Sequence, residues 1–202
     1  MTLAIARTAD AQLLNAAAEG DAQAALAALA DDASVEARDD RGRTPLLLAA
    51  LGDHVEVAQV LVAAGADPNA MDHRHDTPWL VTGVTGSVAM LEVLLPAGAD
   101  LTIRNRYGGV SVIPASERGH IDYVRRVVTT GIDVDHLNDL HWTALLEAVI
   151  LGDGSETYAE IIRILLAAGA HPGLADRDGI TALQHAERLG HARLAEVLRG
   201  TQ

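Results

Sequence analysis

A repeat of 33 residues runs through this chain and limits the folds that it can adopt. An Asp or Asn opens each of five similar segments, at Asp39, Asp72, Asn105, Asn138 and Asp176. The first four openings lie 33 residues apart, and the last step is 38 residues. A segment of this length cannot bury its apolar face alone, so neighbouring segments must stack on each other.

The repeat predicts a single domain. Stepping back by the same period places a degenerate first repeat before Asp39, and a short tail precedes it. We therefore predict an N-terminal tail, 1–9, and one domain, 10–200, of about six repeats. The predicted repeats are 10–38, 39–71, 72–104, 105–137, 138–175 and 176–200.

Residues 39–71 indicate how one repeat folds. Thr44 supplies an N-cap hydroxyl, and the Pro that follows suits the first helical position, so a short helix begins here. The apolar spacing over 55–64 predicts a second helix. Gly65 then provides the residue that a left-handed helix end favours. The sequence predicts two helices in each repeat.

The period and the landmarks TPL at 44–46, GA at 65–66 and GH at 119–120 resemble the ankyrin repeat family. The resemblance covers about residues 10–200. It implies an all-α ankyrin-repeat solenoid, with stacked helix-turn-helix units and short β-hairpin fingers. It also implies a non-catalytic module that binds another protein through its fingertips and the concave surface of its inner helices.

Composition excludes several kinds of chemistry. The chain contains no Cys, which removes disulfides, thiol nucleophiles and thiolate metal sites. It also contains no Lys, so Schiff-base and P-loop lysines are absent. No GxSxG elbow or comparable constellation surrounds the Ser residues. We predict no catalytic activity and no cofactor. Abundant Ala, with Arg in place of Lys, indicates a GC-rich bacterial gene.

The acidic charge argues against two classes of partner. A formal charge of -13 and a pI near 4.9 leave no basic stripe for nucleic acid or an anionic membrane. The first residues lack the continuous apolar run of a secretory signal, and no stretch reaches the length of a membrane span. We expect a cytoplasmic protein that is a monomer or a weak homo-oligomer.

Several residues depart from the repeat pattern. His75 and His141 replace the Gly of the turn before an inner helix, as tolerated variants or as contact residues. Pro114 falls inside an inner helix, where we expect a shifted or broken first turn. Trp79 replaces a core Leu and is interpreted as a core filler. Tyr158 lies in the five extra residues of the long repeat and either packs onto the core or offers a secondary contact.

The irregular middle repeats supply the candidate protein-binding residues. Tyr, Trp and Arg dominate interface hot spots, and two of the five aromatic residues fall on predicted fingertips. The predicted fingertip residues are His73, Arg74, Arg106, Tyr107, Leu140 and Trp142. The predicted residues at the ends of the inner helices are Val84, Glu117, Arg118, Ile150 and Leu151.

Alternatives remain open at this point. The same surface would serve a scaffold, a regulator, or an inhibitor or immunity-type protein that blocks an enzyme. A metal-dependent protein would use the His-rich fingers, but zinc needs three or four converging ligands and we predict no metal site. A cluster of Arg residues in the middle repeats would favour an acidic partner segment if they share one patch. These are Arg74, Arg104, Arg106, Arg118, Arg125 and Arg126.

Overall fold

The computed structural model describes the backbone of residues 2–200 and the side chains of residues 8–200. The chain divides into two compact parts, an N-terminal unit of residues 1–103 and a C-terminal unit of residues 104–202. The single-domain division and the six repeat boundaries stay predictions, and α1 already begins at Thr2, within the predicted tail.

The described residues fold into α-helices that follow each other in pairs. The N-terminal unit contains α1 (Thr2–Glu19), α2 (Ala22–Ala30), α3 (Pro45–Leu51), α4 (Val55–Ala63), α5 (Pro78–Thr85) and α6 (Val88–Leu94). The C-terminal unit contains α7 (Val112–Glu117), α8 (Ile121–Val127), the 3-10 helix η1 (Val128–Thr130), α9 (Ala144–Ile150), α10 (Glu156–Ala167), α11 (Ala182–Arg188) and α12 (Ala192–Arg199).

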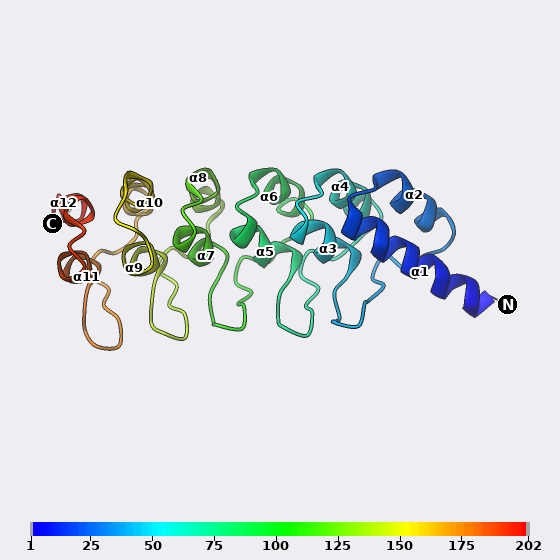
Figure 1. The fold of residues 1–202 in the computed structure, drawn as a ribbon, viewed down its shortest axis with the longest axis horizontal. Coiled ribbons are helices and arrows are strands. Elements are labelled where there is room, and N and C mark those ends of the chain that lie inside the picture. Colours follow the sequence, from blue (N-terminus) through cyan, green and yellow to red (C-terminus); the bar gives the residue numbers. More distant parts are fainter. Residues whose placement is uncertain (1, 201–202) are drawn as a thin grey trace. The chain divides into compact units, whose positions relative to one another are not determined.

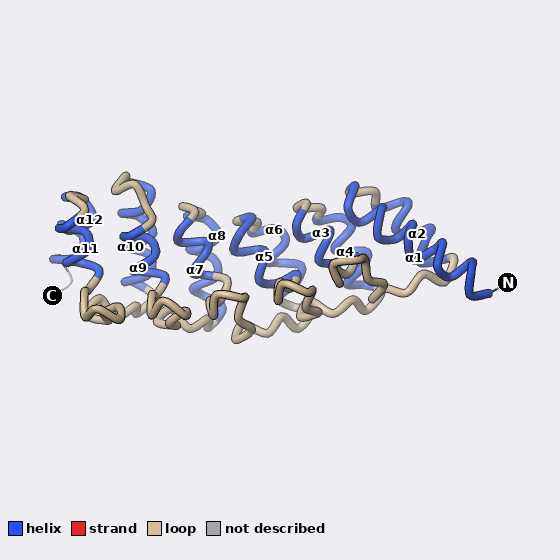
Figure 2. The backbone as a smooth tube through the Cα atoms, turned by 60° about the horizontal axis from the view of Figure 1, so that its bottom comes forward, coloured by secondary structure: helices blue, strands red, loops and turns tan. Residues whose placement is uncertain are grey.

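The first helices of the pairs form one layer of each unit, and the second helices form another (Figure 1). We call them inner and outer helices. Inner helices pack side by side, α1 with α3 and α3 with α5 in one unit, α7 with α9 and α9 with α11 in the other. The outer helices follow the same order. Within each unit the loops before the inner helices project on one side, as Figure 2 also shows.

Local residue chemistry explains where the inner helices begin. The hydroxyl of Thr44 accepts a hydrogen bond from the Leu47 N–H at 3.2 Å, and Thr77 and Thr143 cap their helices in the same way. The third repeat has no capping Thr, and its helix α7 starts one residue later, at Val112. This confirms the shifted first turn. Pro114 then lies in that turn, where a missing N–H costs nothing.

The loops before the inner helices are tight turns, which we call fingers 1 to 5. Their ranges are 39–43, 72–76, 105–109, 138–142 and 176–180. In finger 1 the Asp39 carboxylate accepts hydrogen bonds from the N–H groups of Arg41 and Arg43, both at 2.9 Å. The opening Asp or Asn does the same in the other four fingers.

This side-chain bonding corrects one detail of the expected fold. Residues 2–200 contain no β-strand, only an isolated bridge between Ala175 and Thr181, so the fingers are turns rather than β-hairpins. The physical reason is that the opening side chain takes the N–H groups which a strand ladder would use. The recurring Asp or Asn of the repeat is thereby explained.

Ala, Leu, Val and Ile side chains fill most of the core. The two largest fully buried side chains are Trp79, on α5, and Tyr123, on α8. Trp79 is wholly buried, which confirms its interpretation as a core filler. Burial of these helices against their neighbours holds the fingers in fixed positions and so determines what the molecule presents to a partner.

Candidate protein-binding surface

The fingertips differ between the two units at equivalent repeat positions. The third residue of the finger is Arg41 and Arg74 in the N-terminal unit, but Tyr107 and Leu140 in fingers 3 and 4. Tyr107 is 59% exposed and Leu140 is 53% exposed. Large apolar side chains therefore stand in solvent at the tips of the C-terminal unit.

Three predicted residues lie in the N-terminal unit. His73 and Arg74 are exposed on finger 2, and Val84 is exposed near the end of α5. The His73 N–H donates to the Arg41 carbonyl at 3.0 Å, which links finger 2 to finger 1. His73 and Arg74 thus belong to a braced pair of fingers, while Val84 lies on the adjoining helix.

Four predicted residues lie on fingers 3 and 4 of the C-terminal unit. The Arg106 guanidinium lies over the Tyr107 ring, 4.4 Å from its centre, a cation–π contact that restrains both side chains. The Asp139 N–H donates to the Tyr107 carbonyl at 2.9 Å and joins the two fingers. Leu140 and the half-buried Trp142 complete this group. The structure brings these four residues together on one pair of fingers.

The remaining four predicted residues mark the ends of α7 and α9. These two inner helices pack side by side. Glu117 and Ile150 are half-buried, whereas Arg118 and Leu151 are exposed. The inner face of the C-terminal unit therefore combines apolar and charged side chains next to fingers 3 and 4.

Sequence reasoning missed Glu147, a residue on α9. Its side chain is only 6% exposed, and its Oε1 accepts a hydrogen bond from the Asn138 amide at 2.8 Å. Burial, reinforced by the charge of Glu117, raises the pKa of Glu147 to about 7, while the Asn138 hydrogen bond acts in the opposite direction. Aligning the repeats reveals Glu147 as a buried position, because the equivalent residues are Leu48 and Val81.

The last repeat pairs the same two positions with different residues. His185 on α11 occupies the place of Glu147, and Asp176 occupies the place of Asn138. The His185 Nε2 lies 2.7 Å from the Asp176 carboxylate. The Ile180 N–H, with a further contribution from His185, holds the pKa of Asp176 below its usual range. A polar pair therefore links finger to inner helix in both repeats of this region.

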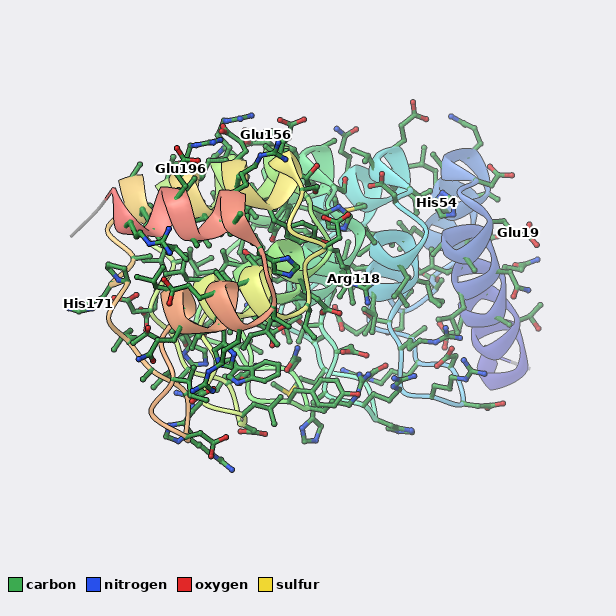
Figure 3. The ribbon with its side chains drawn as sticks, turned by 60° about the vertical axis from the view of Figure 1, so that its left-hand side comes forward. Glu19, His54, Arg118, Glu156, His171 and Glu196 are labelled. Carbon is green, nitrogen blue, oxygen red and sulfur yellow. The ribbon has the colours of Figure 1, made fainter. Side chains whose placement is uncertain are left out.

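Tyr158, in the five-residue insertion, packs onto the neighbouring repeat rather than offering a secondary contact to a partner. Its hydroxyl donates to the Glu117 backbone carbonyl at 2.9 Å, and burial raises the pKa of this half-buried phenol. His54 makes the equivalent contact in the N-terminal unit, with Nε2 at 3.1 Å from the Ala18 carbonyl. In Figure 3 His54 lies beside the end of α1. Tyr158 thus packs inward, as a brace between neighbouring repeats.

The Arg cluster does not form one patch on the inner helices. Arg125 and Arg126 lie on the outer helix α8, and Arg125 pairs with Asp122 at 2.8 Å and Glu160 at 3.1 Å. Arg125 and Arg126 therefore do not contribute to a basic patch for an acidic partner segment. The 33-residue register already separates them from Arg118, because it places Arg125 and Arg126 in the second helix of the repeat and Arg118 at the end of the first.

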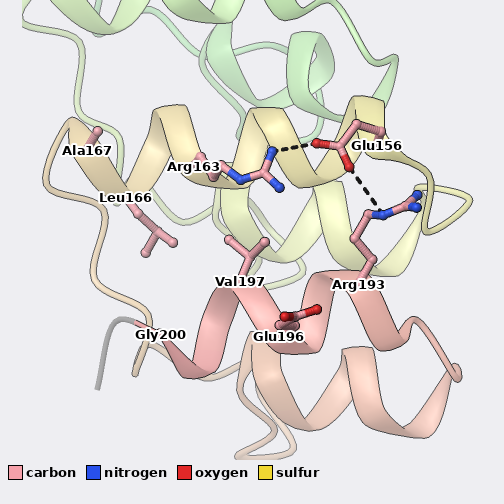
Figure 4. Close-up of a pocket in the computed structure, with 8 residues that line it drawn as sticks. All are labelled: Glu156, Arg163, Leu166, Ala167, Arg193, Glu196, Val197 and Gly200. Carbon is pink, nitrogen blue, oxygen red and sulfur yellow. Dashed lines mark hydrogen bonds and ion pairs between the residues drawn. The ribbon is translucent and has the colours of Figure 1, made fainter.

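The outer helices of the C-terminal unit border an open groove of about 650 Å³ between α10 and α12 (Figure 4). Glu156 bridges Arg163 at 2.7 Å and Arg193 at 3.2 Å across it. Figure 3 places Glu156 and Glu196 together on these outer helices, apart from Arg118. Glu156 and the two Arg residues of the groove satisfy each other, so we assign the groove to packing between repeats.

Two further observations concern other kinds of site. Across the described part of the chain, no group of three or more His, Asp or Glu side chains is arranged to hold a metal ion. No helix among the same residues has the length and hydropathy that a membrane crossing needs.

Comparisons with known proteins agree with this architecture. The ankyrin repeat model matches residues 41–73. YahD of Escherichia coli (strain K12), whose name places it among ankyrin repeat proteins, is 40% identical over 94 residues. That match covers 46% of this chain and 47% of YahD, so the chain matches about half the length of this curated relative.

Two solved structures match almost the whole chain. An ankyrin repeat domain from Acinetobacter baumannii AYE is 45% identical, with a TM-score of 0.89 over 94% of this chain and 96% of that one. The ankyrin repeat protein EF0377 is 35% identical, with a TM-score of 0.91 over 96% and 98%. The fold of these proteins is generally a non-catalytic protein-interaction module. The chain belongs to the ankyrin repeat family, as the 33-residue period predicts.

Proposed function

We propose that this chain is a non-catalytic scaffold or regulator that binds another protein through the fingertips and inner helices. The observation that carries the proposal is the exposure of large apolar side chains on fingers 3 and 4. Tyr107 and Leu140 are each more than half exposed, although the fold buries most side chains of this kind. Exposed apolar groups held on a rigid frame are typical of interaction sites.

The neighbouring residues support an anchor role for this surface. The ring of Tyr107 is already held by Arg106, so binding would cost little side-chain entropy. Leu151 adds a 49% exposed apolar side chain at the end of α9. Trp142, half-buried on finger 4, supplies a second aromatic residue of the kind that dominates hot spots. Partner binding is therefore centred on the C-terminal unit.

Among the described residues, the surroundings of the acid with the most raised pKa support the non-catalytic part of the proposal. Glu147 has a strongly raised pKa, but its described hydrogen-bond partner is an amide, Asn138, and not a nucleophile or an acid–base partner. The chain also contains neither Cys nor Lys. Its chemistry is that of a preformed recognition surface.

The test is affinity capture of a partner from a lysate of the source cells, followed by binding measurements with the purified partner. We expect the double variant Tyr107→Ala with Trp142→Ala to lose at least about 100-fold in affinity, because hot-spot residues contribute 2 kcal/mol or more each. Circular dichroism and the melting temperature of the variant establish that it is folded. The single variant Tyr107→Ala provides the same test without disturbing the half-buried Trp142.

The matched control is Leu26→Ala, which removes a 47% exposed apolar side chain from the outer helix α2. It should leave the affinity unchanged. If the fingertip variants bind as tightly as the unaltered chain, the partner docks elsewhere and the proposed surface is wrong.

A further inference from the structure

The inner face of the C-terminal unit contains a buried acid where the repeat normally places an apolar residue. Leu48 and Val81 occupy the equivalent positions in the N-terminal unit and belong to its core. Glu147 brings a carboxyl group to this position. Burial of an ionisable group is costly unless an opposite charge compensates for it.

The carboxyl group of Glu147 is incompletely satisfied. Asn138 donates to Oε1, and among the described residues no group donates to Oε2. Among the described residues, two side-chain polar atoms, Trp79 Nε1 and Ser111 Oγ, are sealed from solvent and lack a partner. Glu147 Oε2 is not one of them, so it keeps some contact with solvent. One acceptor of a nearly buried carboxyl thus remains open to a group that approaches from outside.

A second acid faces the same region without a cation. Glu117 lies on α7, the inner helix packed against α9, and its charge acts on Glu147. Within residues 8–200, neither carboxylate has an Arg or His side chain within ion-pair distance. Two uncompensated carboxyl groups that repel each other form a favourable environment for one cationic group.

Two exposed apolar side chains, Leu140 and Leu151, lie near Glu147. Leu151 follows Glu147 by one helical turn and is 49% exposed. The Leu140 N–H donates to Asn138 Oδ1 at 2.9 Å, so the side chain that bonds to Glu147 also fixes the exposed tip of finger 4. Glu147 therefore has an exposed apolar side chain on finger 4 and another at the end of α9 near it.

We propose that Glu117 and Glu147 receive an Arg or Lys side chain of the partner protein, with apolar residues beside it packed on Leu140 and Leu151. This inference rests on the proposed function and names the chemistry of the bound segment. A cation at this place would gain charge-assisted hydrogen bonds to both carboxylates in a poorly solvated site. The flanking apolar contacts select a basic residue within a hydrophobic sequence over an isolated one.

The probe is the peptide acetyl-Leu-Arg-Leu-amide, titrated into the isotope-labelled full chain at pH 8 and followed by NMR. Its control is the peptide with citrulline in place of Arg, which has the same shape and no charge. We expect the Arg peptide to shift the Asn138 side-chain amide and the backbone signals of α9. The citrulline peptide should bind about tenfold or more weakly, the effect of losing a charge-assisted contact.

Two variants test the residues separately. Glu117→Gln alters a half-buried side chain, and Glu147→Gln keeps the shape of the buried one; each should reduce binding of the Arg peptide about tenfold. Glu196→Gln, on the outer helix α12, is the matched control and should bind as the unaltered chain does. The Glu117→Gln result stands even if the buried change perturbs folding.

The outcomes separate this inference from the proposed function. Equal binding of the Arg and citrulline peptides, with shifts at Leu140 and Leu151, would overturn the basic-residue inference and leave the apolar surface intact. Absence of binding by the Arg peptide would also overturn it, while the captured-partner experiment still decides the proposed function. Full affinity in both Gln variants would show that the cation binds elsewhere.

Discussion

The two units share one repeat but differ in charge and in what their fingers present. The N-terminal unit contains five Arg and fifteen acidic residues, a formal charge of -10, and its fingertips carry Arg41 and Arg74. The C-terminal unit contains ten Arg and thirteen acidic residues, a formal charge of -3, and its fingertips carry Tyr107 and Leu140. The less charged unit thus displays the apolar tips.

The comparison shows that the backbone of the repeat and its exposed side chains vary independently. The caps, the left-handed glycines and the finger-opening Asp or Asn are kept in both units, so the backbone positions stay the same. At the fingertips, exposed Arg residues are replaced by Tyr107 and Leu140, and at Glu147 an apolar residue of the frame is replaced by a charged one. In the C-terminal unit, therefore, the repeat supplies the geometry and a few replaced residues supply the recognition.

The largest expected effect tests whether the two units are energetically separate. Trp79→Ala and Tyr123→Ala each remove the largest buried side chain of one unit and should lower the free energy of unfolding by about 3–5 kcal/mol. Urea unfolding measures the total loss of stability, and hydrogen exchange by mass spectrometry shows which residues lose protection. We expect the Trp79 variant to lose protection first in residues 39–103 and the Tyr123 variant first in residues 105–200.

The control for this experiment is Leu26→Ala, an exposed change that should stay within about 0.5 kcal/mol. Trp79→Leu, which restores the residue of Leu46 and Leu145, should cost less than Trp79→Ala. It also removes an indole N–H that, among the described residues, has no acceptor. A uniform loss of protection along the chain in both variants would mean that the two units unfold together.

The sequence predicts the helices well because their signals are local. Thr44 and its Pro define a helix start within one turn, and Trp79 could be assigned to the core from its register alone. The prediction of β-hairpin fingers was wrong. The side chains of Asp39 and its equivalents accept hydrogen bonds within their own turn and compete with a strand ladder, which a repeat pattern does not reveal.

The candidate surface was less predictable, since it depends on contacts between repeats. Tyr158 had two interpretations until its hydroxyl was found on the Glu117 carbonyl, 41 residues away in sequence. Glu147 looked like an ordinary acid on a helix, although its repeat position, that of the core residues Leu48 and Val81, indicates burial. Arg125 and Arg118 lie on different helix layers, as their positions in the repeat indicate.

Glu147 distinguishes the two units, because its equivalents in the N-terminal unit are Leu48 and Val81. Because the pKa of Glu147 is raised to about 7 in the folded chain, the folded state binds more protons than the unfolded state between about pH 4.5 and 7. Its contribution to stability therefore falls as the pH rises through this window and is constant above it. Relative to Glu147→Leu, the chain should lose on the order of 3 kcal/mol across the window.

Urea unfolding at several pH values between 4.5 and 8 measures this difference. The Leu variant matches Leu48, so it should be more stable than the unaltered chain at pH 8. Glu196→Gln, on an outer helix, controls for the loss of one acid and should follow the unaltered chain at every pH. Parallel curves for the unaltered chain and Glu147→Leu would show that the carboxyl is not destabilised by burial.

The smallest change in the free energy of unfolding is expected from one turn residue in each unit, His75 on finger 2 and His141 on finger 4. His75 and His141 both have a φ of 62°, in the left-handed region, whereas the equivalent Gly42, Gly108 and Gly179 reach similar angles without a side chain. His75→Gly and His141→Gly should each raise the free energy of unfolding by about 0.5–1 kcal/mol, because backbone strain is relieved. The midpoint of urea unfolding measures the gain.

Gly179→Ala provides the reverse test, because φ there is 73° and a Cβ would meet no atom within 4 Å. It should destabilise the chain by a similar amount through the backbone angle alone. Equal gains for His75→Gly and His141→Gly would mean that both histidines are only tolerated turn residues. A smaller gain for His141→Gly would mean that its ring makes a contact on finger 4 that offsets the strain, which would extend the asymmetry between the units to their turns.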